Sequence, residues 1–267
     1  SGTWQYSRAG WAPGDRVWPW DIDISSDITA GQTSTLGYTA QAYTNTSPDT
    51  GNIARHWVES QVIFYEPYTL DPIAYWQFNE GSGQTAGDSS GNNRDGTMVN
   101  MNEDSWSAGK HCGALAFDGM NDYVEIASFK GISGPASRTC TAWIKTTQTS
   151  GEILGWGDAS AAGAKWIVRI HETGSLRAEV HNGYIFGGIR INDGNWHHVA
   201  VVVADDGSAD IAKAQLYVDG RLDASAGVLA RPINTSVTQN VQLGMHLTER
   251  RYFRGQIDEV RIYNRSL

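Results

Sequence analysis

The chain alternates short apolar runs with clusters of polar residues and glycine, and this pattern predicts an all-β protein. No stretch keeps apolar residues at positions i, i+3, i+4 and i+7 for three turns, as an amphipathic helix requires. Six of the 30 glycines follow Asn or Asp between the apolar runs, which is typical of sandwiches and barrels. We predict strands at 114–117, 123–126, 140–145, 152–156, 166–171, 175–181, 184–191, 197–204, 214–218, 241–244 and 255–263.

Tight turns are predicted between several of these strands. An Asn-Gly or Asp-Gly pair adopts positive φ readily and so favours a two-residue hairpin. Such pairs stand at Asn182-Gly183, Asp193-Gly194 and Asp219-Gly220.

The composition changes near Pro67 and Pro72, which bracket a short spacer. We predict a segment at 1–66, a linker at 67–72 and a complete domain at 73–267. The leading segment offers about four strands, including one at 56–65, and so few strands rarely close an independent core.

The net charge of −9, from 20 basic and 29 acidic side chains, argues against nucleic acid and against anionic membranes as partners. There is no basic stripe in the sequence to release counterions from a phosphate backbone. No apolar run approaches the roughly 18 residues that cross a bilayer, and no amino-terminal signal pattern is present. The beginning at Ser1 is what we expect of a mature or cut end. A neutral or hydroxyl-rich partner fits this charge better.

Aromatic residues are in excess, with 11 Trp and 11 Tyr against 6 Phe. Their flat apolar faces and polar handles suit the binding of sugar rings. Alternatively, these residues fill the core of a sandwich, and we expect about half of them to do so.

Only two cysteines occur, Cys112 and Cys140. They have no zinc-type spacing. Both lie in strand-like runs, which leaves two possibilities open: a single disulfide in an exported protein, or two free thiols.

An ordered series of motifs covers the second segment. It runs through Ala74-Tyr75-Trp76-Gln77-Phe78, Phe117-Asp118-Gly119-Met120-Asn121-Asp122-Tyr123, Ala142-Trp143-Ile144, Trp196-His197-His198-Val199, Leu216-Tyr217-Val218-Asp219-Gly220 and Ile257-Asp258-Glu259-Val260. The series resembles the laminin-G-like, concanavalin A-like lectin/glucanase family. The resemblance implies an antiparallel two-sheet jelly roll with its first and last strands adjacent. It also implies a carbohydrate-binding or spacer module of a secreted or cell-surface bacterial protein.

In similar domains calcium often lies at one rim, and five oxygen-bearing residues suit a hard cation. These are Asp88, Asn92, Asp118, Asn121 and Asp258. If the terminal strands pair, we expect these side chains to converge as a structural calcium site. The alternative is that each one caps a turn by bonding its own backbone.

Polar and aromatic side chains gather on the middle strands and on the loop at 246–252. Together they suit sugar hydroxyls and ring stacking, and the clustered arginines would also suit an anionic sugar. The predicted ligand-binding residues are Trp156, Trp166, Arg169, His171, His181, Tyr184, Arg250 and Tyr252. The alternative is an ordinary solvated sheet face.

Catalysis by this chain alone is not expected. His197 and His198 are adjacent, so on a strand they point to opposite faces and cannot easily share a metal ion. Glu152 and Glu179 are not in the sandwich glucanase pattern Glu-x-Asp-x-x-Glu.

The leading segment resembles the last part of peptide-N-glycosidase F-type proteins through Arg8-Ala9-Gly10-Trp11-x-Pro13-Gly14. Ala12 stands where the family has a cysteine. The catalytic carboxylates of that family lie upstream of the motif, so no residue here inherits a catalytic role. The resemblance implies a partial jelly roll that needs a partner, either its missing amino-terminal part or another chain.

Three functions therefore remain open. The sequence favours a carbohydrate-binding module that holds a glycan or polysaccharide. The alternatives are the carboxy-terminal part of a glycan-releasing amidase and a structural spacer or adhesion domain.

Overall fold

The computed structural model describes residues 36–41, 57–62, 71–127, 129–245 and 250–267. The chain divides into two compact units, Ser1–Thr69 and Leu70–Leu267. In the first unit, β1 (Leu36–Gln41) and β2 (Trp57–Val62) pair antiparallel. The motif at 8–14 lies outside the described residues, so the predicted amidase-type segment stays a prediction.

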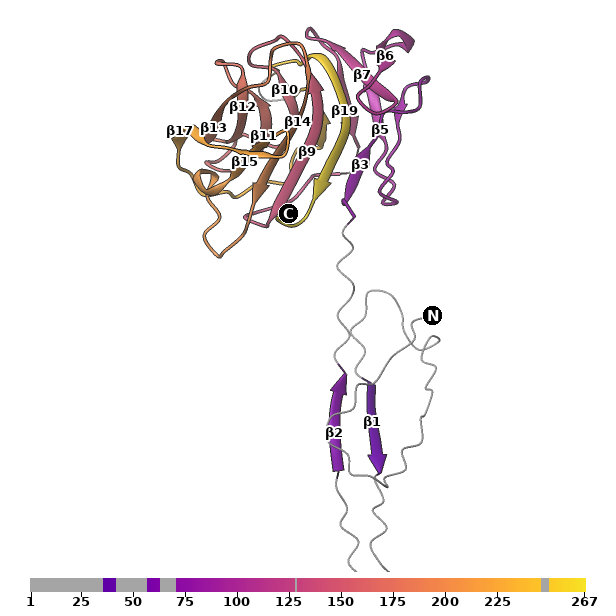
Figure 1. Ribbon diagram of the computed structural model, residues 1–267, viewed down its shortest axis with the longest axis vertical. Helices are drawn as coiled ribbons and strands as arrows, with labels where there is room; N and C mark the ends of the chain where they lie inside the picture. The colour runs from indigo at the N-terminus through magenta and orange to yellow at the C-terminus, as the bar shows by residue number, and fades with distance from the viewer. Residues whose placement is uncertain (1–35, 42–56, 63–70, 128, 246–249) are drawn as a thin grey trace, which may run out of the picture. The chain divides into compact units, whose positions relative to one another are not determined.

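The second unit is an all-β sandwich of two antiparallel sheets, which lie face to face (Figure 1). The nine-stranded sheet has the order β17 (Ser225–Leu229), β13 (Gly183–Arg190), β12 (Ser175–Val180), β11 (Lys165–Ile170), β10 (Glu152–Gly157), β18 (Val241–Leu243), β8 (Tyr123–Ile126), β5 (Gly96–Val99) and β4 (Thr85–Ala86).

The eight-stranded sheet forms the other layer. Its order is β16 (Arg221–Asp223), β15 (Gln215–Val218), β14 (Trp196–Val203), β9 (Arg138–Lys145), β19 (Arg254–Tyr263), β7 (Gly113–Asp118) and β6 (Trp106–Ala108), and β3 (Ala74–Trp76) also pairs with β19. The helical elements of the described residues are two short 3-10 turns, η1 (Glu103–Ser105) and η2 (Ile211–Lys213). None of the helices described there is long and apolar enough to cross a membrane.

The core fills the space between the sheets, and alternate residues of the central strands enter it. On β11 the core residues are Trp166, Val168 and Ile170, and on β9 they are Cys140, Ala142 and Ile144. The residues between them face away from the core. This alternation defines an outer face on each sheet.

The first strand of the sandwich lies beside the last, which confirms the predicted adjacency. β3 pairs with β19 through Ala74 opposite Ile262 and Trp76 opposite Val260 (Figure 1). Trp76 is fully buried, and its indole Nε1 donates to the carbonyl of Arg94 at 2.9 Å. The ends of the domain are therefore held together by both sheet pairing and core packing.

The predicted strands all overlap observed ones, whereas β3 to β6, β16 and β17 were not predicted. Two predicted hairpins are confirmed: Asn182 (φ 64°) joins β12 to β13, and Asp219 (φ 50°) joins β15 to β16. The hairpin at Asp193-Gly194 is wrong. The strands on either side of it, β13 and β14, belong to different sheets, so the turn crosses between the layers.

His197 links this crossover to the β15–β16 hairpin. Its Nδ1 lies 2.8 Å from Asp219 Oδ2, and its Nε2 lies 3.1 Å from Asp193 Oδ1. Burial alone would lower the pKa of His197, but the bonds to Asp219 and Asp193 raise it. The charged imidazolium is therefore favoured in the folded protein.

This arrangement predicts a pH-dependent stabilisation by His197. Because the folded-state pKa is raised above the ordinary value of 6.5, the contribution is fully present below that value and is lost as the pH rises through the folded pKa. We expect His197→Gln to lower the free energy of unfolding more at pH 5.5 than at pH 8.5. Urea unfolding of both proteins at the two pH values measures this, and an equal loss at both would contradict it.

Candidate functional site

The outer face of the nine-stranded sheet carries a group of charged side chains that are nearly excluded from water. Lys165 and Arg169 on β11 and Glu179 on β12 alternate with core residues and so face away from the core. They are 4%, 2% and 5% exposed. Charges this deeply buried are costly unless they are paired.

Glu179 lies at the centre of this group. Its carboxylate is 2.8 Å from Lys165 Nζ, 3.0 Å from Arg169 Nε, 2.9 Å from Arg177 Nε and 3.1 Å from Arg251 Nη2. Burial alone would raise the pKa of Glu179, but the neighbouring cations outweigh burial and lower it to about 2. The carboxylate is thus ionised throughout the physiological range.

The group extends in two directions from Glu179. Arg251 also lies 2.9 Å from Glu152 Oε1, and Glu152 is fully buried at the start of β10. In the other direction, Arg169 Nη1 lies 3.0 Å from Glu172 Oε1. We call the set of Glu152, Lys165, Arg169, Glu172, Arg177, Glu179 and Arg251 the ion network. The network contains four cations and three carboxylates, so its net charge is close to zero.

Three half-buried aromatic rings lie beside the ion network. The rings of His171 and Phe186 are parallel within 5° and 3.7 Å apart, and the Tyr184 ring centre is 6.1 Å from that of Phe186. The guanidinium carbon of Arg177 lies 4.1 Å from the Tyr184 ring centre. We call His171, Tyr184 and Phe186 the aromatic platform.

The sheet itself holds the platform in place. Tyr184 stands opposite Glu179, and Phe186 stands opposite Arg177 on one side and Gly227 of β17 on the other. A Cβ atom at Gly227 would lie 2.3 Å from Phe186 Cε1, so glycine leaves the space that the ring occupies. Burial lowers the pKa of His171, which favours the neutral, stackable imidazole.

Chemically, the platform and the ion network form a flat apolar surface bordered by fixed hydrogen-bonding groups. Such a surface suits a ligand with one apolar face and many hydroxyl groups. Because Glu179 is ion-paired with the cations, the surface has little net positive charge to attract an anionic ligand.

The structure brings together three of the predicted ligand residues, Arg169, His171 and Tyr184. His181 is half-buried at the β12–β13 turn, where its carbonyl accepts from the amide of Gly163. Arg250 is exposed and Tyr252 is half-buried on either side of Arg251. It is Arg251, between these two predicted residues, that enters the ion network.

For Trp156 and Trp166 the predicted role as ligand contacts is wrong. Both indoles are fully buried in the core, with ring centres 6.0 Å apart. Trp156 Nε1 donates to the carbonyl of Ile132 at 3.1 Å. Trp166 and Arg169 are three residues apart on one strand, so they lie on opposite faces of the sheet.

Five residues of the network and the platform were not predicted from the sequence: Lys165, Glu172, Arg177, Phe186 and Arg251. Glu179 was predicted only as a possible catalytic group, and rejected as such. The sequence did contain a signal for Arg177 and Glu179. They stand two and four residues after Ser175 on β12, so all three side chains point to the same face of the sheet. Phe186 shares the parity of Tyr184 on β13 in the same way. The long-range approach of Arg251 to β12 has no signal in the local pattern.

The predicted calcium ligands do not form one site. Asp88 lies opposite Trp76, which pairs with Val260, whereas Asp118 pairs with Arg254. These positions are six residues apart along β19, about 20 Å at the usual strand rise.

Four of the five side chains instead bond backbone groups. Asp118 does so within its own turn, as the alternative anticipated, whereas Asp88, Asn92 and Asp258 reach more distant segments. Asp88 accepts from the amides of Tyr75, Ser90 and Arg94, and Asp118 Oδ1 accepts from those of Met120 and Asn121. The side-chain Nδ2 of Asn92 donates to the carbonyl of Ile73. Asp258 is fully buried and accepts from the amide of His111 at 2.9 Å.

Within the described part of the chain, no group of three or more His, Cys, Asp or Glu side chains is placed to hold a metal ion. The five residues therefore do not fit a shared calcium ion. Calcium binding by the protein stays a prediction.

Of the two possibilities left open for the cysteines, the disulfide is not formed, and both thiols are free. Cys112 is exposed just before β7, and Cys140 points into the core from β9. Because β19 lies between β7 and β9 in the sheet, the two thiols are not on neighbouring strands.

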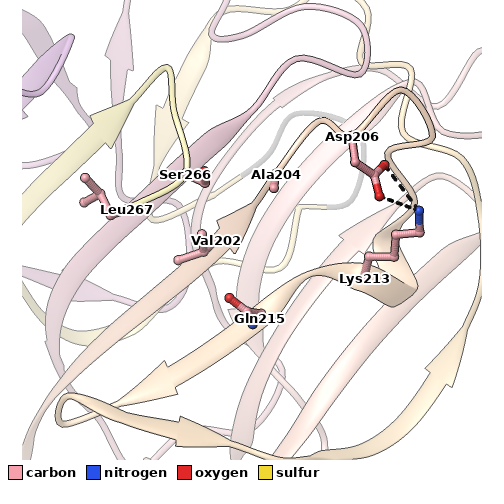
Figure 2. Close-up of a pocket in the computed structure, with 7 residues that line it drawn as sticks. All are labelled: Val202, Ala204, Asp206, Lys213, Gln215, Ser266 and Leu267. Atoms are coloured by element: carbon pink, nitrogen blue, oxygen red, sulfur yellow. Dashed lines mark hydrogen bonds and ion pairs between the residues drawn. The ribbon is translucent and has the colours of Figure 1, made fainter. Parts of the chain in front are cut away.

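A shallow hollow of about 320 Å³ lies at the end of β14 and β15 (Figure 2). Asp206 and Lys213 on its border pair with each other at 2.9 Å. It has no aromatic lining, so it lacks the surface that makes the platform suitable for a ring-shaped ligand.

Residues 118–267 match the family model described as the concanavalin A-like lectin/glucanases superfamily. This covers more than half of the chain, and the chain belongs to that superfamily. No curated protein matches the sequence.

Solved structures share the fold at low sequence identity. The binding domain of Paraclostridial Mosquitocidal Protein 1 has a TM-score of 0.54 and 14% identity, covering 74% of this chain and 49% of that one. The present chain thus spans about half of that structure. The Ruminococcus gnavus IT-sialidase CBM40 bound to alpha2,3 sialyllactose has a TM-score of 0.45 and 16% identity, covering 58% and 91%. Domains LG4-5 of the mouse laminin alpha1 chain have a TM-score of 0.43 and 17% identity, covering 60% and 44%.

The ion network predicts a large effect of removing the charge of Glu179. In Glu179→Gln the buried cations keep their charge without a carboxylate between them, and breaking such a network costs about 3–5 kcal/mol. We expect that loss in urea unfolding at pH 7. Because the folded pKa is depressed, the contribution is present above the ordinary value of 4.5 and is lost as the pH falls toward about 2.

The matched control is Asp206→Asn, which breaks the exposed ion pair with Lys213. It should change the free energy of unfolding little, because solvent screens exposed pairs. Equal effects of the two substitutions would contradict the structural importance of the network.

Proposed function

We propose that the sandwich is a carbohydrate-binding module that holds a glycan on the outer face of its nine-stranded sheet. The observation that carries this proposal is the aromatic platform. Stacking of Phe186 on His171 and the position of Tyr184 create a flat, half-exposed surface that suits the apolar face of a sugar ring.

The ion network supports the proposal through rigidity. Lys165, Arg169 and Glu179 are tied together across β11 and β12, directly beside Tyr184 and Phe186. A binding surface whose side chains are already fixed loses less conformational entropy when the ligand arrives. The network thus supplies a preformed border of hydrogen-bonding groups around the platform.

The charge balance favours a neutral sugar at this face. Arg169 bonds Glu179 through Nε, and Glu172 and the carbonyl of Ile170 through Nη1, so three of its five N–H groups are already engaged. The anionic sugar suggested by the clustered arginines would compete with Glu179 for the same cations.

The proposal includes that the protein is secreted or displayed on the cell surface, where it would meet a polysaccharide or another glycan. The membership in a superfamily of lectins and glucanases supports a glycan-active context. The spacer alternative is an outcome that the following experiment separates from binding.

The test is binding of the full chain to a glycan array, with and without calcium, followed by affinity measurements on the strongest glycan. We expect Phe186→Ala to weaken binding about tenfold or more, since a central aromatic contact commonly contributes over 1.4 kcal/mol. Phe186→Leu keeps apolar volume but removes the flat face, so it should also weaken binding.

Tyr217→Ala serves as the matched control, because it removes a half-buried ring from the other sheet. Circular dichroism checks that each variant is folded. Absence of any bound glycan under both conditions would favour the spacer function, and unchanged affinity in Phe186→Ala would overturn the placement of the site.

A further inference from the structure

The outer face of the eight-stranded sheet carries three cation–aromatic pairs. Lys110 Nζ lies 4.7 Å from the Trp143 ring centre. The guanidinium carbon of Arg261 lies 4.0 Å from the Tyr75 ring centre, and that of Arg265 lies 5.5 Å from the Tyr263 ring centre. We call these six residues the basic-aromatic stripe.

The strand register places the pairs in successive rows. Trp143 on β9 stands opposite Asp258, Thr141 stands opposite Arg261, and Thr139 stands opposite Tyr263. On its other side Arg261 pairs with Tyr75. Consecutive rows are two residues apart, about 6.6 Å at the usual rise, so the stripe is extended along the strands.

The loop before β7 is fixed over Trp143. The buried carboxylate of Asp258 accepts from the amide of His111. A Cβ atom at Gly109 would lie 2.8 Å from Asp258 Oδ2 and 2.0 Å from the carbonyl oxygen of Gly113. Only glycine allows this close approach, which sets Lys110 above the indole.

Two histidines complete this end of the stripe. The rings of His111 and His198 meet Trp143 edge-on, with centres 5.8 Å and 5.3 Å away. His111 and Lys110 are exposed, and Trp143 is half-buried. Both the charge and part of the indole are therefore available to a ligand.

A β-bulge orients the second pair. Two residues of β19, Glu259 and Val260, stand where β9 has one, and Glu259 has a φ of 54°. This strained conformation directs its carboxylate to the hydroxyl of Tyr75 at 2.6 Å and to Arg261. Bulges of this kind redirect side chains at functional surfaces.

The charge of this stripe differs from that of the ion network. Lys110 and Arg261 lie beside one carboxylate, that of the nearly buried Glu259, which pairs with Arg261, and Lys110 has no acidic partner among the described residues. The patch is thus positive on a chain whose net charge is −9. Local positive charge against the overall sign selects for an anionic ligand.

We propose that the basic-aromatic stripe is a second binding surface, which takes an acidic polysaccharide whose sugars carry carboxylate or sulfate groups. The exposed part of the Trp143 indole receives a sugar face, and Lys110 and Arg261 receive the anionic groups through charge-assisted hydrogen bonds. The succession of rows fits an extended chain of sugars. This surface is independent of the aromatic platform on the opposite face.

The test measures binding of the full chain to immobilised heparin, to hyaluronan and to uncharged dextran as salt is raised. We expect binding to one or both acidic polymers, none to dextran, and weakening with salt. Lys110→Glu should lower the affinity about tenfold or more, because it replaces an attraction by a repulsion. Trp143→Ala should also lower the affinity, but it should change the salt dependence of binding less than Lys110→Glu does.

Lys130→Glu is the matched control, since it makes the same charge change outside the stripe, where Lys130 Nζ lies 3.4 Å from the carbonyl of Thr238. It should keep the affinity within about twofold. Binding to neither acidic polymer, or equal losses in Lys110→Glu and Lys130→Glu, would overturn the proposal. Binding of single-stranded oligo(dT) with the same dependence on Lys110, and of neither polysaccharide, would assign the stripe to nucleic acid instead.

Discussion

The two-residue alternation of side chains along a strand is the constraint on which this sandwich depends. On β11 it sends Trp166, Val168 and Ile170 into the core and leaves Lys165 and Arg169 on the outer face. Both layers repeat the pattern. A shift of one residue in any central strand would bury charges among apolar side chains and expose indoles to water. The same two-residue alternation therefore determines which residues form the core and which form the outer faces.

The two outer faces differ in how their charged side chains are paired. On the nine-stranded sheet, cations and carboxylates neutralise each other around Glu179 and leave flat rings beside a rigid border. On the eight-stranded sheet, Lys110 lies over Trp143 without an acidic partner among the described residues. A protein built in this way can present a nearly neutral surface and a basic one on opposite sides of a single core. The difference follows from which outward residues have a carboxylate within reach.

The fold was largely predictable because strand patterns and Asn-Gly or Asp-Gly turns are local signals. The failure at Asp193-Gly194 has a physical cause, since a turn sequence does not specify which sheet its next strand joins. At the proposed site, Arg169, His171 and Tyr184 were predicted from their residue types. Trp166 does not join them, because it is three residues from Arg169 on the same strand and so lies on the opposite face. The contacts of Arg251 and Asp258 join distant segments, and no local pattern reports them.

The central claim is that the outer face of the nine-stranded sheet is where a glycan is held. A crystal structure of the chain with a bound oligosaccharide tests it most directly. The account predicts a sugar ring lying against Phe186 and Tyr184, within hydrogen-bonding distance of Arg177 or Arg251, whose side chains are less buried than that of Arg169. A sugar held only by the loops at the rim of the sandwich, with the aromatic platform left in water, would contradict it.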